Sequence, residues 1–162
     1  MVDHITDTKH DIRDTDMSGL KFSQIRSAIV TQIQNVSGMR LSKQLPDYFG
    51  RMQDTVAHKG FTVEIGISTQ RTDERQRISV GVYVQTAVIV KVAFRLRPLD
   101  VYPTDYDLAL DLEDELIHQI LQSYQSIQAI QIRFNQVSRA STASNEYILS
   151  TIEFTVYHTL KQ

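Results

Sequence analysis

The chain has 162 residues, of which 41% are hydrophobic and 22% charged, with no cysteine and a formal net charge of −2. This composition fits one globular domain that buries a core without disulfides or a structural metal. It excludes thiol catalysis and thiolate metal sites. No apolar run approaches the roughly 18 residues that a membrane span requires, and the near-neutral charge gives no general attraction for nucleic acid.

The N-terminal segment differs from the rest of the chain. Residues 1–16 contain five Asp against Lys9 and Arg13, a net charge of 2 − 5 = −3, which leaves +1 for the remainder. So polar and acidic a segment is no secretory signal. We expect residues 1–18 to form a flexible acidic arm and residues 19–162 a single α+β domain.

The first half of the chain predicts one helix and one strand before the longest apolar pattern. A helix over 20–38 is indicated by apolar residues at helical spacing, with Gly38 at its end: Phe22, Ile25, Ile29, Ile33 and Val36. Residues 39–59, with Pro46 and Gly50, predict an irregular connection. The strand FTVEIGI follows, and its alternation places four side chains on one face: Phe61, Val63, Ile65 and Ile67.

The stretch ISVGVYVQTAVIVKVAFRL, residues 78–96, is apolar at every even position except Thr86. Alternation predicts a strand with one buried face, and the absence of usual turn residues after Val82 argues against a hairpin, although a three-residue turn around Thr86 would preserve the alternation. One strand of this length would run roughly 60 Å, whereas a compact domain of this size is about 40 Å across. We therefore expect the strand to bend strongly, for example near Gly81, or to project beyond its own core.

The second half predicts a helix and two strands. Thr104 is placed as the N-cap of a helix whose apolar stripe comprises Leu108, Leu112, Leu116 and Ile120. Residues 129–137 and 147–160 alternate as strands, joined by a loop of small residues. The expected fold is α+β: two helices packed on a mostly antiparallel four-stranded sheet, in the order α-β-β-α-β-β, with one very long bent strand.

No catalytic set is legible in the sequence. The five histidines lack metal-ligand spacing, and no glycine cluster or GxSxG motif occurs. The carboxylates of Asp111, Glu113, Asp114 and Glu115 are expected on the solvated face of their helix, and His158 at a frayed strand end. We therefore expect no enzyme activity, no metal and no cofactor.

A projecting strand would expose alternating valines, which an additional subunit would have to cover. The charged loop before the strand could pair with a neighbouring copy in a closed ring, or it could be an ordinary solvated loop. The residues predicted at a subunit interface are Arg71, Asp73, Glu74, Arg75, Arg77, Val80, Val82 and Val84. Those predicted to face a channel or a partner are Lys91, Arg95 and Arg97, which edge protection by charge would also explain.

In element order, residues 20–160 resemble the tail terminator (tail completion) proteins of long-tailed bacteriophages. The similarity consists of the helix FSQIRSAIVTQIQNV, the strand FTVEIGI, a polar loop, the long strand RISVGVYVQTAVIVKVAFRL, the helix DYDLALDLEDELIHQIL and the strand YILSTIEFTVYHTL. The acidic leader and residues 39–59 fall outside it.

The resemblance implies a virion protein of the tail or neck, assembled in the bacterial host cytoplasm. It implies a hexameric ring that caps the tail tube and joins it to head-side connector proteins, with DNA only passing through its channel and no membrane partner. The alternative left open by the residues is a dimeric ferredoxin-like ligand-binding or regulatory domain.

Overall fold

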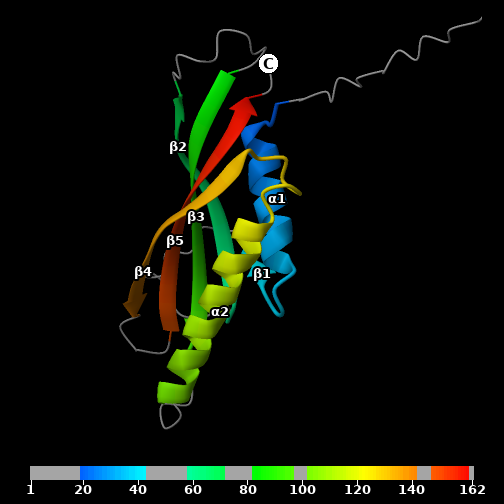
Figure 1. The fold of residues 1–162 in the computed structure, drawn as a ribbon. Coiled ribbons are helices and arrows are strands. Elements are labelled where there is room, and N and C mark those ends of the chain that lie inside the picture. Colours follow the sequence, from blue (N-terminus) through cyan, green and yellow to red (C-terminus); the bar gives the residue numbers. More distant parts are fainter. Residues whose placement is uncertain (1–18, 43–57, 72–81, 97–101, 142–146, 161–162) are drawn as a thin grey trace, which may run out of the picture.

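The computed structural model describes residues 19–42, 58–71, 82–96, 102–141 and 147–160 (Figure 1). Their elements are α1 Phe22–Gln34, β1 Arg40–Leu41, β2 Gly60–Gln70, β3 Val82–Arg95, α2 Tyr102–Gln122, β4 Gln131–Ser141 and β5 Tyr147–Leu160. The predicted α+β class is confirmed. The sheet has a fifth strand, β1, within residues predicted to form an irregular connection.

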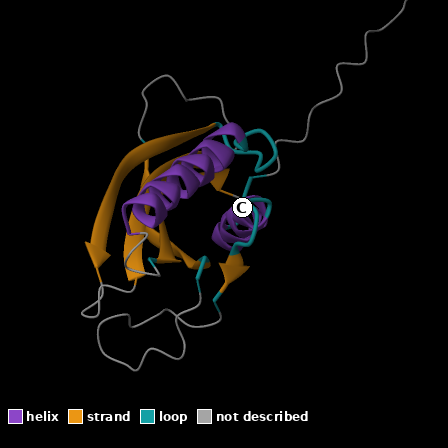
Figure 2. Cartoon of the chain, turned by 90° about the horizontal axis from the view of Figure 1, so that it is seen from below, coloured by secondary structure: helices purple, strands orange, loops and turns teal. Residues whose placement is uncertain are grey.

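The five strands form one sheet in the order β1-β2-β3-β5-β4. Neighbouring strands are antiparallel except β1 and β2, which are parallel. Both helices lie on one side of this sheet, as Figures 1 and 2 show. We call that side the helix face and the opposite side the outer face.

Strand β3 lies at the centre of the sheet and spans its length. It pairs with β5 at all fourteen positions, from Val82 with Leu160 to Arg95 with Tyr147, and with β2 on its other side. This pairing excludes the alternative turn at Thr86. Residues 82–95 do not project beyond their own sheet, because β5 pairs with them along their whole length. Residues 78–81 lie outside the described part.

The core fills the space between the helix face and the two helices. The predicted inward sets of β3 and β5 are buried there, and the contacts with α1 and α2 complete the cluster: Val84, Thr86, Val88, Val90, Val92, Phe94, Ile148, Ile152, Phe154, Val156, Ile25, Ile29, Ile33, Leu116 and Ile120. Each large apolar side chain stabilises the fold by about 1.5–3 kcal/mol when fully buried. Gly38 has φ 79°, in agreement with its predicted position after α1.

A β-bulge in β2 reverses one predicted orientation. Ile65 pairs with Val88 and Ser68 with Thr86, so Gly66 and Ile67 together face the single residue between those two on β3. The extra residue shifts the alternation by one. Ile67 therefore lies on the outer face with 78% of its surface exposed, and its predicted inward position is wrong.

Helix α2 differs from the predicted helix in its start and its rotation. It begins at Tyr102, so Thr104 lies within it and is not its N-cap; Pro103 is tolerated in a first turn, where an N–H has no intrahelical partner. Leu108 is 55% exposed, whereas Glu113 is buried. The buried stripe runs through Ala109, Glu113, Leu116, Ile120 and Ser123.

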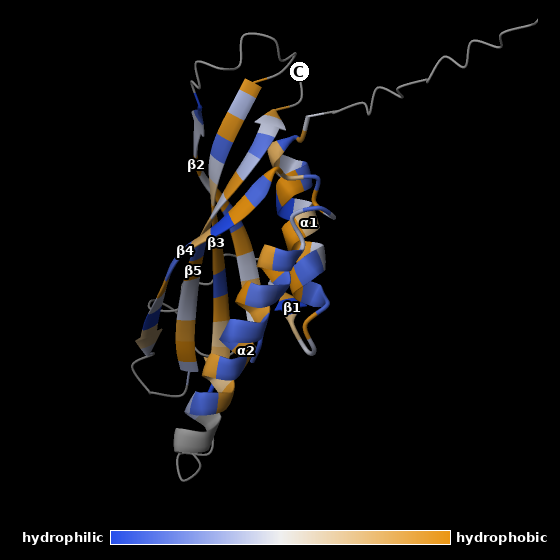
Figure 3. Ribbon diagram, in the orientation of Figure 1, coloured by the Kyte–Doolittle hydropathy of each residue, from blue (hydrophilic) through white to orange (hydrophobic). Residues whose placement is uncertain are grey.

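Strand β4 extends further than the sequence indicated. It continues to Ser141, although residues 138–146 had been assigned to a loop. An irregularity between Phe134 and Gln136 places Asn135 as an extra residue, so that Val137, paired with Ile152, returns to the helix face. Hydropathy colouring shows hydrophilic and hydrophobic residues alternating along the strands (Figure 3).

The bulge in β2 predicts opposite effects for two isoleucines that are two residues apart. Ile65→Ala removes a side chain packed against the core and should lower the free energy of unfolding by about 2 kcal/mol. Ile67→Ala removes an exposed side chain and should change it by less than about 0.5 kcal/mol. Urea unfolding of both variants measures this, and equal losses would mean that Ile67 faces the core.

Candidate interaction surface

The outer face of the sheet is buried at one end and open at the other, and we call the open end the upper part. Near the end formed by Gly60 and Arg95, the outer-face residues Thr62, Ala93 and Leu149 are buried. Towards the other end, Thr69, Arg133 and Asn135 are exposed together with Ile67. No described helix or strand covers this upper part, which is therefore the accessible surface of the sheet.

The upper part is hollowed. A depression of about 390 Å³ lies between four strands and is lined by Ile67, Thr69, Gln85, Ala87, Arg133, Asn135, Thr155 and Tyr157. Asn135 donates a hydrogen bond from Nδ2 to Thr155 Oγ1 at 2.8 Å. The Arg71 guanidinium lies over the Tyr157 ring, 5.0 Å from its centroid, a cation–π contact that holds the ring at one side. The lining is polar and contains no carboxylate.

The two edges of the sheet also lack strand partners within the described residues over most of their length. Strand β1 pairs only with Gly60 and Phe61, so no described strand lies beside β2 on that side from Thr62 onward, although the Val63 carbonyl oxygen accepts a hydrogen bond from Arg26 Nε at 2.9 Å. On the opposite edge β4 pairs only with β5, and nine of its eleven residues are exposed. Unpaired edge N–H and C=O groups are templates for pairing with another chain.

The predicted interface residues are partly visible. Arg71 is exposed and on the outer face, Val82 is half-buried opposite Leu160, and Val84 is buried within the chain itself. Asp73, Glu74, Arg75, Arg77 and Val80 lie outside the described residues. Only 5% of the surface of Val84 is exposed, so other groups of this chain would lie between Val84 and a neighbouring copy. The interface assignment of the set stays a prediction.

Of the predicted channel-facing residues, Lys91 and Arg95 lie on the outer face and Arg97 lies outside the described part. Lys91 Nζ is 3.2 Å from Glu64 Oε1 on the paired strand. This half-exposed ion pair neutralises Lys91 locally and is worth little in water. Arg95 is exposed.

A buried polar chain joins three strands on the helix face. Ser68 Oγ donates to Thr86 Oγ1 at 3.0 Å, and Thr86 Oγ1 is 2.8 Å from His158 Nε2. His158 Nδ1 is 3.3 Å from the Thr159 carbonyl oxygen, which can only accept, so Nδ1 carries the proton and Nε2 accepts from the Thr86 hydroxyl. The single polar break in the apolar alternation is thus the partner of a buried histidine.

His158 is completely buried, so its predicted fraying is wrong, although its inward orientation is confirmed. Its ring meets Phe22 edge-on, with centroids 5.9 Å apart. Burial lowers the pKa of His158 below 6.5, against the smaller opposite effect of the Thr159 carbonyl. The polar break at Thr86 and the even position of His158 were the available signals, but their pairing depends on the strand register.

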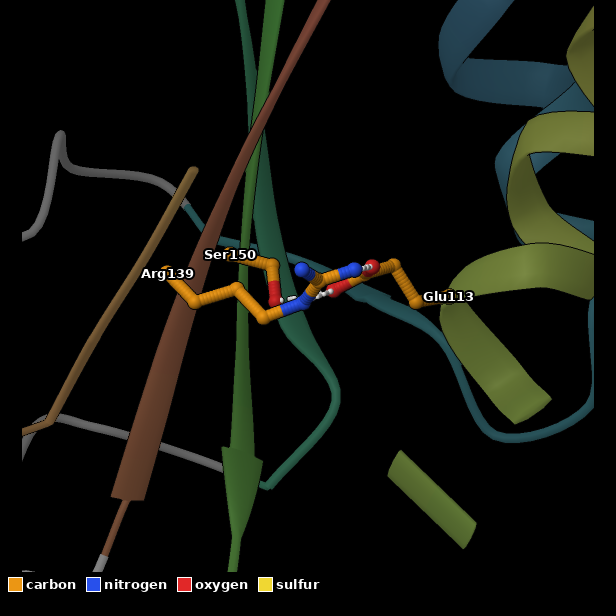
Figure 4. A network of polar contacts seen from close by, with 3 residues as sticks. All are labelled: Glu113, Arg139 and Ser150. Atoms are coloured by element: carbon orange, nitrogen blue, oxygen red, sulfur yellow. Dashed lines mark hydrogen bonds and ion pairs between the residues drawn. The ribbon is translucent and has the colours of Figure 1, made fainter. Parts of the chain in front are cut away.

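Glu113 is a second buried polar residue, and its position differs from the predicted one. Only 3% of its surface is exposed, because α2 turns it towards the sheet (Figure 4). Ser150 Oγ donates to Glu113 Oε2 at 2.6 Å and Arg139 Nε donates to it at 3.1 Å, while Arg139 Nη2 binds Oε1. This bidentate contact raises the pKa of Arg139 and ties α2 to β4 and β5. The expected solvated position of Glu113 is therefore wrong.

In chemical terms the accessible surface offers hydrogen-bonding side chains and unpaired backbone groups of the strand edges. Among the described residues, no group of three or more His, Asp and Glu side chains is placed to hold a metal ion. In the same part of the chain no helix has the length and apolarity of a membrane span. The accessible features are the hollow and the two strand edges.

The environment of His158 predicts a pH dependence of stability. The unfolded chain takes up a proton at His158 below about pH 6.5, which the folded chain resists, so the free energy of unfolding should fall as pH falls below 6.5. One such group contributes at most about 1.4 kcal/mol per pH unit. Urea unfolding between neutral and mildly acidic pH should show a shallower dependence for His158→Gln than for wild type. The exposed His118 is the control: His118→Gln should keep the wild-type slope, and identical slopes for all three proteins would contradict the assignment.

The Glu113 contact predicts a large loss for one carboxylate in an acidic run. Glu113→Ala leaves Ser150 and Arg139 without their acceptor, but Arg139 is 37% exposed and can reach water. The loss of unfolding free energy should therefore be about 2 kcal/mol, below the cost of opening a fully buried ion pair. Glu115→Ala, at an exposed position on the same helix, should stay within about 0.5 kcal/mol. Equal effects in thermal or urea unfolding would refute the buried position.

Comparison with known proteins gives similarity to solved structures and no sequence match. No family profile matches the chain, and no curated protein sequence matches it. Among solved structures, a chain of the "Virion of native gene transfer agent (GTA) particle" is similar with a TM-score of 0.41 and 9% sequence identity, over 83% of this chain and 93% of that chain.

Proposed function

We propose that the chain is a structural virion protein: a tail terminator that forms a ring, caps the tail tube and joins it to the head-side connector. The observation that carries the proposal is the pair of strand edges, on opposite sides of one sheet, that have no strand partner among the described residues over most of their length. The element order, which resembles that of tail terminators, supports the same role.

The directions of the strands allow copies to join edge to edge. Strands β2 and β5 run one way, and β3 and β4 run the other way. In a cyclic arrangement, β4 of one copy would lie antiparallel to β2 of the next, so the alternation of directions would continue across the boundary. Such a contact between different surfaces closes into a ring when the rotation between copies is right.

The two edges also limit how this contact can form. Each carries an irregularity near its middle, at Gly66 and Ile67 in β2 and at Asn135 in β4. Bulges at edges restrict open-ended strand addition. We therefore expect short stretches of backbone pairing, supported by side chains such as Ile67, rather than one continuous ladder.

In the proposed ring the helices of all copies would lie on one side of a wall of strands and the outer faces on the other. The predicted charged residues 71–77 would then adjoin the next copy, and Lys91, Arg95 and Arg97 would face the channel or a partner. Hexameric symmetry, tail tube and connector partners, and passage of DNA follow from the resemblance alone.

A dimeric ferredoxin-like binding domain is the second candidate, and the topology gives it one specific observation. Moving β5 in front of α1 converts the order of the long elements into β-α-β-β-α-β, the ferredoxin-like order. The hollow on the outer face would then be the ligand site. A stable dimer whose melting temperature rises with a small molecule would favour this function over the ring.

The ring proposal predicts that a charge at one strand edge blocks assembly without unfolding the subunit. Ile67→Lys places an ammonium group on an exposed side chain of the β2 edge, so the free energy of unfolding should change by less than about 0.5 kcal/mol. Rings should be lost, because the charge would be desolvated between copies. Mass photometry and electron microscopy, with and without tail tubes, measure the assembly.

The matched control is Leu108→Lys, which changes another exposed apolar residue on α2, away from both edges. It should assemble as wild type does. A protein that stays monomeric in wild-type form, even with tail tubes present, would reject the proposed function.

A further inference from the structure

Arg133 is the arginine among the residues that line the hollow. It is exposed and makes no hydrogen bond or ion pair with any described residue. Other cations of the same region are engaged: Lys91 with Glu64, Arg139 with Glu113, and Arg71 with the Tyr157 ring. A free guanidinium that faces a hollow is a ready donor pair for a carboxylate.

The surroundings of Arg133 favour an anionic group. The lining supplies neutral hydrogen-bonding side chains, Thr69, Gln85, Asn135 and Thr155, and no acidic residue. Over the described outer face the basic residues are Arg40, Arg71, Lys91, Arg95 and Arg133, and the acidic residues are Glu64 and Glu153, a net charge of 5 − 2 = +3. Lys91 pairs with Glu64, and Arg40 and Arg95 lie at the other end of the face, so the cations at the hollow are Arg71 and Arg133.

We propose that this hollow binds the chain's own acidic N-terminal segment, residues 1–18, with Arg133 as the main contact. The segment has five Asp against two basic residues, a net charge of −3, whereas the described outer face has a net charge of +3. Asp side chains supply the carboxylates that a guanidinium binds in a bidentate manner. The proposal does not depend on the chain being a virion protein.

The point at which the segment joins the fold is close to the hollow. Leu20 N donates to the Thr159 carbonyl oxygen at 2.7 Å, and Leu20 pairs with Leu160 at the end of β5. Tyr157, which lines the hollow, is three residues earlier on the same strand, a distance of about 10 Å. Eighteen residues reach up to about 60 Å when extended, so the segment can reach the hollow of its own chain or of a neighbour.

Trypsin cleavage of the full-length protein tests the proposal, because Lys9 and Arg13 are trypsin sites inside the segment. At low salt the bound segment should be protected, and Arg133→Glu should raise the initial rate of cleavage after Arg13 about fivefold, the scale of one exposed ion pair. High salt should raise the wild-type rate in the same way, because it screens exposed charges. Intact-mass spectrometry follows the cleavage.

Two matched variants separate docking from a general change of charge or fold. Arg133→Lys keeps the positive charge and should retain part of the protection. Arg40→Glu makes the same charge reversal at an exposed arginine on β1, remote from the hollow, and should cleave at the wild-type rate. Equal rates for wild type, Arg133→Glu and Arg40→Glu would overturn the proposal.

The rival occupant is a phosphate-bearing ligand. If a single-stranded oligonucleotide bound wild type and not Arg133→Glu, while the segment was cleaved rapidly in both, the proposal would be overturned in favour of that ligand class. The oligomeric mass of each protein, measured in the same buffer, separates this result from ring formation. A variant that still assembles but whose N-terminal segment is no longer protected from trypsin has lost the docking of the segment and not the ring.

Discussion

The pairing of β3 with β5 over fourteen consecutive positions is the constraint on which the rest of the structure depends. Both strands carry an alternating apolar set, and a shift of one residue would turn either set to the opposite face. The register that aligns Val88 with Phe154 and Val90 with Ile152 places all of these side chains on one side. The two helices cover that side, so the opposite face must be polar and accessible wherever no other group covers it.

The buried polar side chains form hydrogen bonds that connect the neighbouring strands and α2 to the β3–β5 pair. Glu113 is the side chain of α2 that contacts β4 and β5 through hydrogen bonds, whereas the neighbouring contacts of the helix are apolar and non-directional. It therefore fixes the rotation of α2 on the sheet. At the other end, Ser68, Thr86 and His158 link β2, β3 and β5 in one row, where the chain enters α1. Satisfied polar groups of this kind favour one arrangement of a core over its alternatives, because any shift leaves them unpaired.

The placement of both helices on one side also decides where interactions with other molecules can occur. The hollow and the strand edges belong to the outer face and to the rim of the sheet. Edge pairing would use backbone groups, whereas the hollow offers neutral hydrogen-bonding side chains and the guanidinium of Arg133, which has no partner among the described residues. The proposed ring and the proposed docking of the N-terminal segment thus use different chemistry on one sheet and can be tested separately.

Sequence alone determined the elements whose pattern is local and uninterrupted. The full range of β5, the helix ending before Gly38, and the inward sets of β3 and β5 follow from periodicity, since a strand or helix repeats its faces at a fixed spacing. Two further assignments remain predictions from the sequence: the interface residues between positions 71 and 84, and the three cationic residues expected to face a channel.

Only the tertiary structure decided the features that depend on a partner strand or helix. The bulge that turns Ile67 outward, the return of Val137 to the helix face and the short strand β1 exist because of pairing with other segments, which no local pattern encodes. The burial of Glu113 likewise required Arg139 and Ser150 from distant strands, because a carboxylate stays in water unless donors replace its hydration. His158 became a core residue for the same reason, since the register pairs it with Val84 and brings the Thr86 hydroxyl within hydrogen-bond distance of its ring.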